Sequence, residues 1–263
     1  MTRRGLHGVW LGLRPYAVVD VLQQELASAR TRGAVPDTVL LLEHEPVVTL
    51  GRRADASHVL LSEQALRARG IALSQTSRGG DVTAHAPGQL VGYPIVDLAP
   101  DRCDVRRYVR CLTEVMRSLA LAHGISAGEV AGLVGLWVDL DRPTDFSPDR
   151  DGARLAKLGA IGVRIAHWVT SHGFALNLTT APDVFRTIVP CGIREHGVTS
   201  VREITGARPE TRTEAVRALE ALATALDGEV VSFRDRSDGP LEPWIDELRG
   251  ALGGSDAASD RGA

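Results

Sequence analysis

Cys191 is a residue whose type and position suit a nucleophile. It lies between a proline and a glycine in IVPCGI, directly after a short helical pattern, so the turn can present its sulfur. A thiolate is a strong nucleophile, but a free thiol with a pKa of about 8.5 needs a nearby cation or base to ionise at neutral pH. Cys111 differs, because it lies within the apolar pattern of a helix. Cys191 is therefore the candidate nucleophile.

Lys157, in ARLAKLGAIG, is the only lysine among 30 lysine and arginine residues. Arginine stays protonated at any working pH, whereas lysine loses its proton when it is desolvated or placed near another cation. The lone lysine is either a product of chance or a residue that must titrate. A titrating lysine beside a thiol would hold the proton of that thiol and return it to a leaving group.

A glycine-rich loop, SRGGDVTAHAPGQL, would let backbone N–H groups approach a ligand closely. It is either a binding loop or a plain connection between strands. It lacks the lysine of a phosphate-binding P-loop and the glycine spacing of a dinucleotide site. His172 precedes Gly173 inside a strand pattern, where a lone histidine is more often structural than catalytic.

Two other kinds of active site fit the sequence poorly. A zinc centre would recruit His85, His172, Cys191 and His196, but no pair has the close spacing of a structural zinc site, and HExxH is absent. A serine hydrolase would carry GxSxG, which the sequence lacks. We therefore expect no metal and no serine nucleophile.

Strands and helices must position these residues. Helical patterns cover about residues 15–30, 62–69, 104–123, 182–189 and 211–228. Strand patterns cover TVLLLEH, VVTLGRR, IALSQTS, LVGYPIVDL, GLVGLWVDL and two strands joined near residues 166–169. The mixture predicts an α/β or α+β protein with a sheet core. We expect one domain over residues 1–250, in which residues from about 209 onward form a helical cap, and a disordered tail over residues 251–263.

The composition argues against several kinds of partner. The net charge is −3 and there is no polybasic run, so neither nucleic acid nor a membrane surface is expected to bind. No apolar run approaches the roughly 18 to 20 residues of a membrane span. The three cysteines, Cys103, Cys111 and Cys191, are not spaced as a disulfide framework, and the N-terminus lacks a signal-peptide pattern. We expect a cytoplasmic protein with reduced thiols.

Four segments together resemble the lipoyl(octanoyl) transferase family, within the biotin/lipoate-protein-ligase-like superfamily. They are EHEPVVTLGRR, RGGDVTAHAPGQLVGYPIVDL, KLGAIGVRIAHWVTSHGFALNL and FRTIVPCGI with GVTSV, and they lie in order over roughly residues 35–205. Any one segment alone would be weak, but the combination is specific.

The resemblance implies a mixed β-sheet flanked by helices. It implies an acyltransferase that moves an octanoyl group from octanoyl-acyl carrier protein to a lysine of a lipoyl domain, through a cysteine thioester. No resident cofactor is implied, since the donor is carried on the phosphopantetheine of the carrier protein. The implied acceptors are the lipoyl domains of 2-oxoacid dehydrogenase complexes and the glycine cleavage H protein.

The resemblance also implies residue roles. Cys191 would carry the acyl group, and Lys157 would lower the pKa of that cysteine. The acyl site would be lined by Arg78, Gly79, Gly80, Asp81, Val82, Thr83, Ala84, His85, Ala160, Ile161, Gly162, Gly173, Phe174 and Ala175. Backbone N–H groups of Gly79 and Gly80 are candidate oxyanion donors. The sequence departs from the family pattern at Ala84, Ala86 and Phe174, which leaves the preferred acyl length open.

Two rival functions stay open. An ATP-dependent lipoate- or biotin-protein ligase would have the same fold, but it would need nucleotide-binding groups and no cysteine nucleophile. A non-catalytic binding protein would have kept the fold without the chemistry. The pairing of Cys191 with Lys157 favours direct transfer over both.

Overall fold

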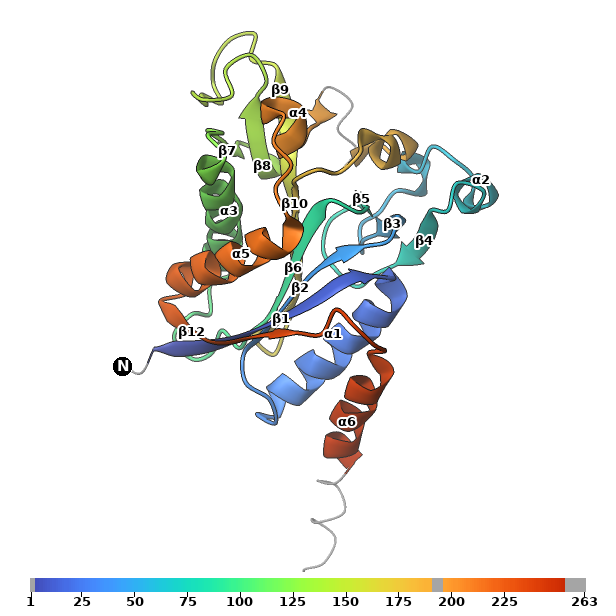
Figure 1. Ribbon diagram of the computed structural model, residues 1–263, viewed down its shortest axis with the longest axis vertical. Helices are drawn as coiled ribbons and strands as arrows, with labels where there is room; N and C mark the ends of the chain where they lie inside the picture. Colours follow the sequence, from blue (N-terminus) through green and yellow to red (C-terminus); the bar gives the residue numbers. More distant parts are fainter. Residues whose placement is uncertain (1–2, 191–195, 254–263) are drawn as a thin grey trace, which may run out of the picture.

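A computed structural model of the protein describes residues 3–190 and 196–253. Its largest feature is a mixed sheet, as expected (Figure 1). In spatial order the strands are β12 (Gly228–Asp235), β1 (Arg4–Arg14), β2 (Thr38–His44), β6 (Gln89–Ile95), β10 (Val169–Asn177), β9 (Leu155–Ala166), β8 (Leu133–Asp139) and β7 (Gly128–Val130). The short β11 (Gly197–Val198) also pairs with β9.

The direction of strand pairing changes across the sheet. β12, β1 and β2 are parallel, whereas β2, β6, β10, β9, β8 and β7 form successive antiparallel pairs. β9 and β10 form a long hairpin whose turn residues, His167 and Trp168, both have positive φ. Two such residues are typical of the tight turn whose twist matches that of the strands.

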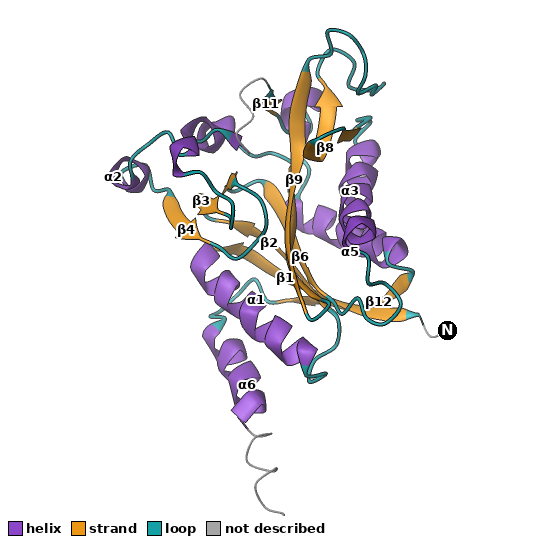
Figure 2. Cartoon of the chain, turned by 180° about the vertical axis from the view of Figure 1, so that it is seen from behind, coloured by secondary structure: helices purple, strands orange, loops and turns teal. Residues whose placement is uncertain are grey.

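Two pairs of helices cover the faces of this sheet (Figures 1 and 2). α3 (Val105–Ala122) and α5 (Thr211–Ala225) lie on one face, and α1 (Tyr16–Thr31) and α6 (Glu242–Gly253) on the other. The strands alternate between these faces. On β10, Phe174 and Leu176 pack in the core beneath α3 and α5, whereas Val169 and Ala175 pack beneath α1. We call these two sides the α3/α5 face and the α1 face.

A second sheet carries the glycine-rich loop. β3 (Val47–Leu50) lies between β4 (Ala72–Gln75), which runs parallel to it, and the antiparallel β5 (Val82–His85). α2 (Glu63–Arg67) and the short 3-10 helices η1 (Ala56–His58) and η2 (Pro182–Thr187) surround it. Its own apolar core includes Val48, Leu66, Val82, Ala84 and Ile188. The last short helix, α4 (Val201–Thr205), begins at Ser200, whose hydroxyl accepts from Glu203 N.

The expected helical cap after residue 209 is wrong in part. α5 is a helix, but the chain then returns as β12 and pairs with β1 from Arg4↔Gly228 to Trp10↔Asp235. The N-terminal segment, which we did not expect to be a strand, is therefore an inner strand of the main sheet. α6 ends at Gly253, and the remainder of the expected tail lies outside the described residues. Among the described helices, none is long and apolar enough to cross a bilayer.

The buried carboxylate of Asp37 joins the elements that meet near β1. It accepts hydrogen bonds from Arg4 Nη1 on β1 at 2.5 Å, from Arg30 Nε on α1 at 2.7 Å, and from Asp97 N after β6 at 3.0 Å. The side chain is 6% exposed. One carboxylate thus holds β1, α1 and the end of β6 at the start of β2.

We predict that Asp37→Asn lowers the free energy of unfolding by about 2 kcal/mol, because Arg4 would lose its carboxylate partner and Arg30 would keep only Asp97, whose Oδ2 lies 3.5 Å from its Nη1. Urea denaturation measures the loss. The control is Asp227→Asn, the same change at a carboxylate that is 64% exposed and 3.0 Å from Arg107. We expect the control to lie within about 0.5 kcal/mol of the parent protein. Equal losses in the two variants would contradict the role given to Asp37.

Candidate active site

Lys157 lies on β9 and is almost completely buried, at 6% exposure. It pairs with Trp137 on β8, next to a register shift, and its Nζ lies 5.4 Å from the centre of the Trp137 ring. Gly135 on β8 has φ +127°, and a Cβ there would lie 2.7 Å from Lys157 Cε. The glycine leaves room for the lysine stem, and the indole face attracts a cation. Trp137 and Gly135 therefore position the lysine amine.

Cys191 lies outside the described residues, but the chain on both sides of it is described. Before it, Val189 N donates to His58 O at 2.7 Å. After it, the ring of His196 meets the Trp137 ring edge-on at 5.6 Å, and Val198 pairs with Lys157. The described residues that follow Cys191 thus lie directly beside the lysine.

The glycine-rich loop is held against the small sheet by a buried arginine. Arg78 is 8% exposed, and its Nη2 donates to Thr49 O and Thr49 Oγ1, both at 2.8 Å. Gly79 N donates to Val163 O on β9 at 2.9 Å. This bond already uses the Gly79 N–H that we offered above as an oxyanion donor. The loop therefore bridges β3 and β9.

Asp81 links this loop to the chain that precedes Cys191. Its Oδ2 lies 2.6 Å from His58 Nδ1, and its Oδ1 accepts from Asp55 N at 3.0 Å. The carbonyl of His58 accepts from Val189 N. Both carboxylate oxygens of Asp81 thus make contacts that stabilise the local structure.

The two predicted strand segments are cross-strand neighbours. Ala160 pairs with Ala175, Ile161 with Phe174, and Gly162 with Gly173. Gly173 also lies close to β6, since a Cβ there would be 2.2 Å from Gly92 O. Close backbone approach explains the glycine in this strand.

Most of the predicted site residues line one narrow cavity of about 50 Å³. We call it the lysine cavity. From the predicted set it contains Arg78, Gly80, Asp81, Val82, Thr83, His85, Lys157, Ala160, Ile161, Gly162, Gly173, Phe174 and Ala175, and it adds Tyr16, Tyr93 and His172. Gly79 and Ala84 do not line it. Ala84 packs in the core of the small sheet, on the side of β5 opposite to Thr83 and His85.

Buried aromatic rings form one wall of the cavity. The rings of Tyr16 and His85 are stacked, with centroids 6.3 Å apart, and His44 lies 5.4 Å from His85. His44 Nδ1 donates to Arg14 O, so its Nε2 accepts from the Tyr93 hydroxyl at 2.9 Å. The His85 Nδ1 donates to Gln89 Oε1 at 2.6 Å.

These histidines are neutral near pH 7. Burial lowers the pKa of His44 to about 4 and that of His85 to about 3. Burial, with Arg78 and Arg164 nearby, also lowers the pKa of His172 to about 3. Burial raises the pKa of Tyr16 and of Tyr93 above the ordinary value. The wall therefore supplies rings and hydrogen bonds but no charge.

Sequence reasoning did not assign Tyr16, His44, Tyr93, Trp137 or His172 to the site. The first four lie in apolar patterns that also describe a core, so residue type alone gives no signal. His172 was weighed and judged structural. In the part of the chain that the structure describes, no three His, Cys, Asp or Glu side chains converge in a way that could hold a metal ion.

Comparisons with known proteins agree with this arrangement. The family model of the lipoyl protein ligase A/B catalytic domain matches residues 15–223. An octanoyltransferase of Chloroflexus aurantiacus is 43% identical over 228 residues, which are 86% of this chain and 94% of that protein. An octanoyltransferase of Myxococcus xanthus is 44% identical over 222 residues, 84% of this chain but only 59% of that longer protein.

Solved structures share the fold at much lower identity. A bi-partite lipoate protein ligase of Thermoplasma acidophilum superposes with a TM-score of 0.65 at 14% identity, covering 96% of this chain and 92% of that one. A lipoate-protein ligase A bound with ATP gives 0.62 at 15% identity, covering 96% and 95%. The sheet, the site and the sequence relatives together show that the chain belongs to the lipoyl protein ligase A/B catalytic-domain family, among relatives that are octanoyltransferases.

Proposed function

We propose that the chain moves an octanoyl group from acyl carrier protein to a lysine of a lipoyl domain, through a thioester on Cys191. The observation that carries the proposal is the placement of the only lysine. Lys157 is buried in a cavity that otherwise consists largely of small residues, apolar residues and neutral rings. The chain that follows Cys191 is anchored beside it. The sequence relatives are named octanoyltransferases, which supports octanoyl as the group that is transferred.

In the first half of the reaction, the Cys191 thiol gives its proton to the Lys157 amine. The resulting thiolate attacks the thioester carbonyl of the donor, and a new carbon–sulfur bond forms. When the tetrahedral intermediate collapses, the bond to the phosphopantetheine sulfur breaks, and Lys157 returns the proton to that sulfur. The products are free carrier protein and octanoyl-Cys191.

In the second half, the neutral amine of an acceptor lysine attacks octanoyl-Cys191. Lys157 takes a proton from the attacking nitrogen, an amide bond forms, and the Cys191 sulfur departs and regains the proton. The two halves form a ping-pong mechanism in which every bond formed is matched by a bond broken and every proton is accounted for.

Other described groups that line the cavity are poorly suited to this proton transfer. His85 and His172 have a pKa of about 3, so they would hold very little proton at neutral pH. Arg78 is permanently charged. Asp81 is engaged by His58 and by Asp55 N. Burial raises the pKa of Tyr16 and of Tyr93, so both keep their protons. Among the described groups, Lys157 remains for the role of acid and base.

The two described cysteines offer no alternative nucleophile. Cys111 lies between α3 and α5, its Sγ donates to Ala225 O at 3.2 Å, and burial raises its pKa. Cys103 is exposed before α3. Neither residue lines the lysine cavity. Cys191 is the third of three cysteines in the chain.

The expected partners are octanoyl-acyl carrier protein as donor, and the lipoyl domains of 2-oxoacid dehydrogenase complexes and the glycine cleavage H protein as acceptors. Arg52 and Arg53 are exposed beside the glycine-rich loop, where their backbone N–H groups donate to Arg78 O and Gly80 O. Two exposed cations at this edge would favour acidic partners.

The rival function is ATP-dependent ligation, because a ligase bound with ATP shares the fold. A ligase activates a free acid as an acyl-adenylate, so it exchanges pyrophosphate into ATP when octanoate is present. Direct transfer has no such step. Exchange of labelled pyrophosphate into ATP, dependent on octanoate, would favour the ligase over our proposal.

We predict that Lys157→Arg lowers kcat/KM for octanoyl transfer by at least about a hundredfold, because arginine keeps the charge but cannot exchange a proton. The measurement is octanoyl transfer from carrier protein to a purified lipoyl domain, with the melting temperature as a check on folding. The control is Arg154→Lys, three residues earlier in the chain and 65% exposed. It should retain the parental rate. A folded, active Lys157→Arg enzyme would remove the acid–base role.

We predict that octanoyl-carrier protein leaves an octanoyl adduct on the parent protein and none on Cys191→Ser. Intact-mass spectrometry detects the adduct, and hydroxylamine should release it, as expected of a thioester. Cys103→Ser and Cys111→Ser are the matched controls and should still acquire it. An adduct that persists on Cys191→Ser but disappears in one of the controls would place the nucleophile there.

A further inference from the structure

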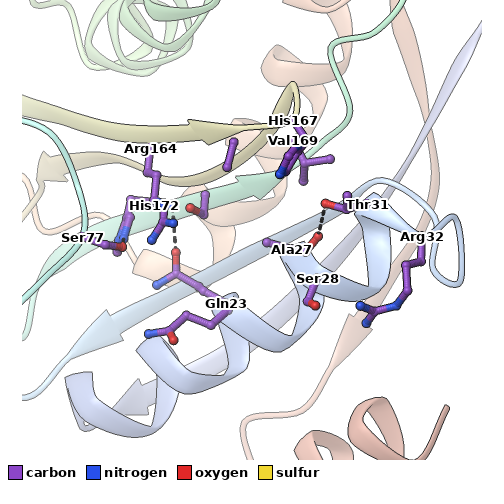
Figure 3. Close-up of a pocket in the computed structure, with 13 residues that line it drawn as sticks. Gln23, Ala27, Ser28, Thr31, Arg32, Ser77, Arg164, His167, Val169 and His172 are labelled. Carbon is purple, nitrogen blue, oxygen red and sulfur yellow. Dashed lines mark hydrogen bonds between the residues drawn. The ribbon is translucent and has the colours of Figure 1, made fainter. Parts of the chain in front are cut away.

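A second cavity lies between α1 and the β9–β10 hairpin (Figure 3). Its volume is about 310 Å³, and we call it the hairpin pocket. Its lining includes Gln23 and Ala27 from α1, Arg164 from β9, and Ser171 and Val169 from β10. His172 lines both this pocket and the lysine cavity.

The two cavities lie end to end along the α1 face. Alternate residues of β9 line first the lysine cavity, at Ala160 and Gly162, and then the hairpin pocket, at Arg164 and Ala166. The same order holds on β10, where Ala175 and Gly173 line the lysine cavity, and Ser171 and Val169 line the hairpin pocket. On α1, Tyr16 lines the first and Gln23 the second. Three elements therefore run past both cavities in the same order.

His172 stands at the junction because its backbone breaks the alternation of β10. It pairs with Val163, whose side chain packs on the α3/α5 face, and regular alternation would place the imidazole there as well. Instead His172 has φ +55°, a left-handed conformation that is strained for a residue with a Cβ. Its ring lies edge-on to Tyr93 at 6.0 Å, and Tyr93 belongs to the α1-side core.

Two polar side chains hold His172 at this junction, one through its backbone amide and one through its ring. Gln23 Oε1 accepts from His172 N at 2.8 Å, an interaction drawn in Figure 3. The ring Nε2 lies 3.2 Å from the hydroxyl oxygen of Ser77, the residue before the buried Arg78. His172 itself is only 3% exposed. A strained residue that is fixed from two sides indicates a defined task at that place.

We propose that His172 is the end wall of the acyl-binding cavity and sets the longest acyl chain that the enzyme accepts. The inference rests on the proposed function, which places the acyl carbonyl near Lys157. The three residue steps along β10 from Ala175 to His172 span about 10 Å. The seven C–C bonds of an extended octanoyl chain, each about 1.5 Å long, span about 9 Å. An octanoyl chain whose carbonyl lies beside Ala175, the cross-strand partner of Ala160, would thus end at the imidazole.

The residues beyond His172, in the hairpin pocket, make its imidazole a limit on acyl-chain length. A longer chain would have to displace the ring and enter a pocket that is partly lined by Arg164, Ser171 and Gln23. Charged and hydrogen-bonding groups are poor surroundings for methylene groups. In the present structure the lysine cavity is narrow, so the side chains along it move apart when an acyl chain enters. The end wall is fixed by the backbone of β10, by its bond to Gln23 on α1 and by the contact of the ring with the Ser77 hydroxyl.

The test compares carrier proteins loaded with acyl chains of six to fourteen carbons. His172→Gly removes the ring and tolerates the positive φ, so it opens the wall without added strain. We expect the ratio of kcat/KM for decanoyl to that for octanoyl to rise about tenfold, the value of burying two more methylenes. Ser77→Ala keeps the His172 ring but removes the hydroxyl that contacts its Nε2. It should shift the same ratio in the same direction by a smaller factor.

The matched control is Ser28→Ala, in the hairpin pocket but on α1 and away from the junction. It should keep the parental length profile. If the parent transfers octanoyl and both junction variants keep its profile, the end-wall role is overturned. If His172→Gly fails to fold, an unchanged acyl-length profile in Ser77→Ala is enough by itself to overturn the end-wall role. A parent protein that transfers no acyl group of any length would instead refute the proposed function.

Discussion

The site depends on how closely four backbone segments, β6, β9, β10 and the glycine-rich loop, approach one another. β10 packs so tightly against β6 that a side chain at Gly173 would meet the carbonyl of Gly92 at 2.2 Å, and the Gly79 amide bonds directly to β9. This approach leaves a narrow space whose surface is largely main chain and small side chains. An apolar chain gains most from such a lining through close contact along its length. The glycines therefore shape the space that the chemistry needs.

Polar groups around this space are organised so that few of them carry charge. The buried histidines are held neutral by desolvation, and His44 and His85 each have a hydrogen-bond partner. Gln89 and Asn177, which belong to the sequence motifs, bond to each other at 2.8 Å, and Asn177 Nδ2 donates to Thr199 O. Thr199 N in turn donates to Lys157 O. The motif residues thus join the rings of one wall to the backbone that carries the lysine.

Where local pattern and position coincide, the motifs of the sequence identified residues that the structure brings together. The loop after β4 and the strand residues beside Gly162 and Gly173 were identified from motifs, and they meet in one cavity. Ala84 was placed with them because it lies in the same motif. Its side chain instead packs in the core of the small sheet. The pairing of β1 with β12 joins residues more than two hundred positions apart, and no local pattern records such a partner. His172 was judged structural because a lone histidine in a strand is more often structural than catalytic, and strand periodicity carries no information about its left-handed φ.

The geometry around Lys157 gives a physical reason why one lysine persists in a chain that otherwise uses arginine. Its stem crosses Gly135, where a single added carbon would come within 2.7 Å of Cε. A thin methylene stem fits this passage, and the amine at its end, unlike a permanently charged guanidinium, can exchange a proton. Lys157 Nζ then lies over the Trp137 ring, which His196 also contacts. Trp137 thus connects the lysine to the chain that follows Cys191, so one side chain orients the amine and contacts the described residues nearest to that cysteine on its C-terminal side.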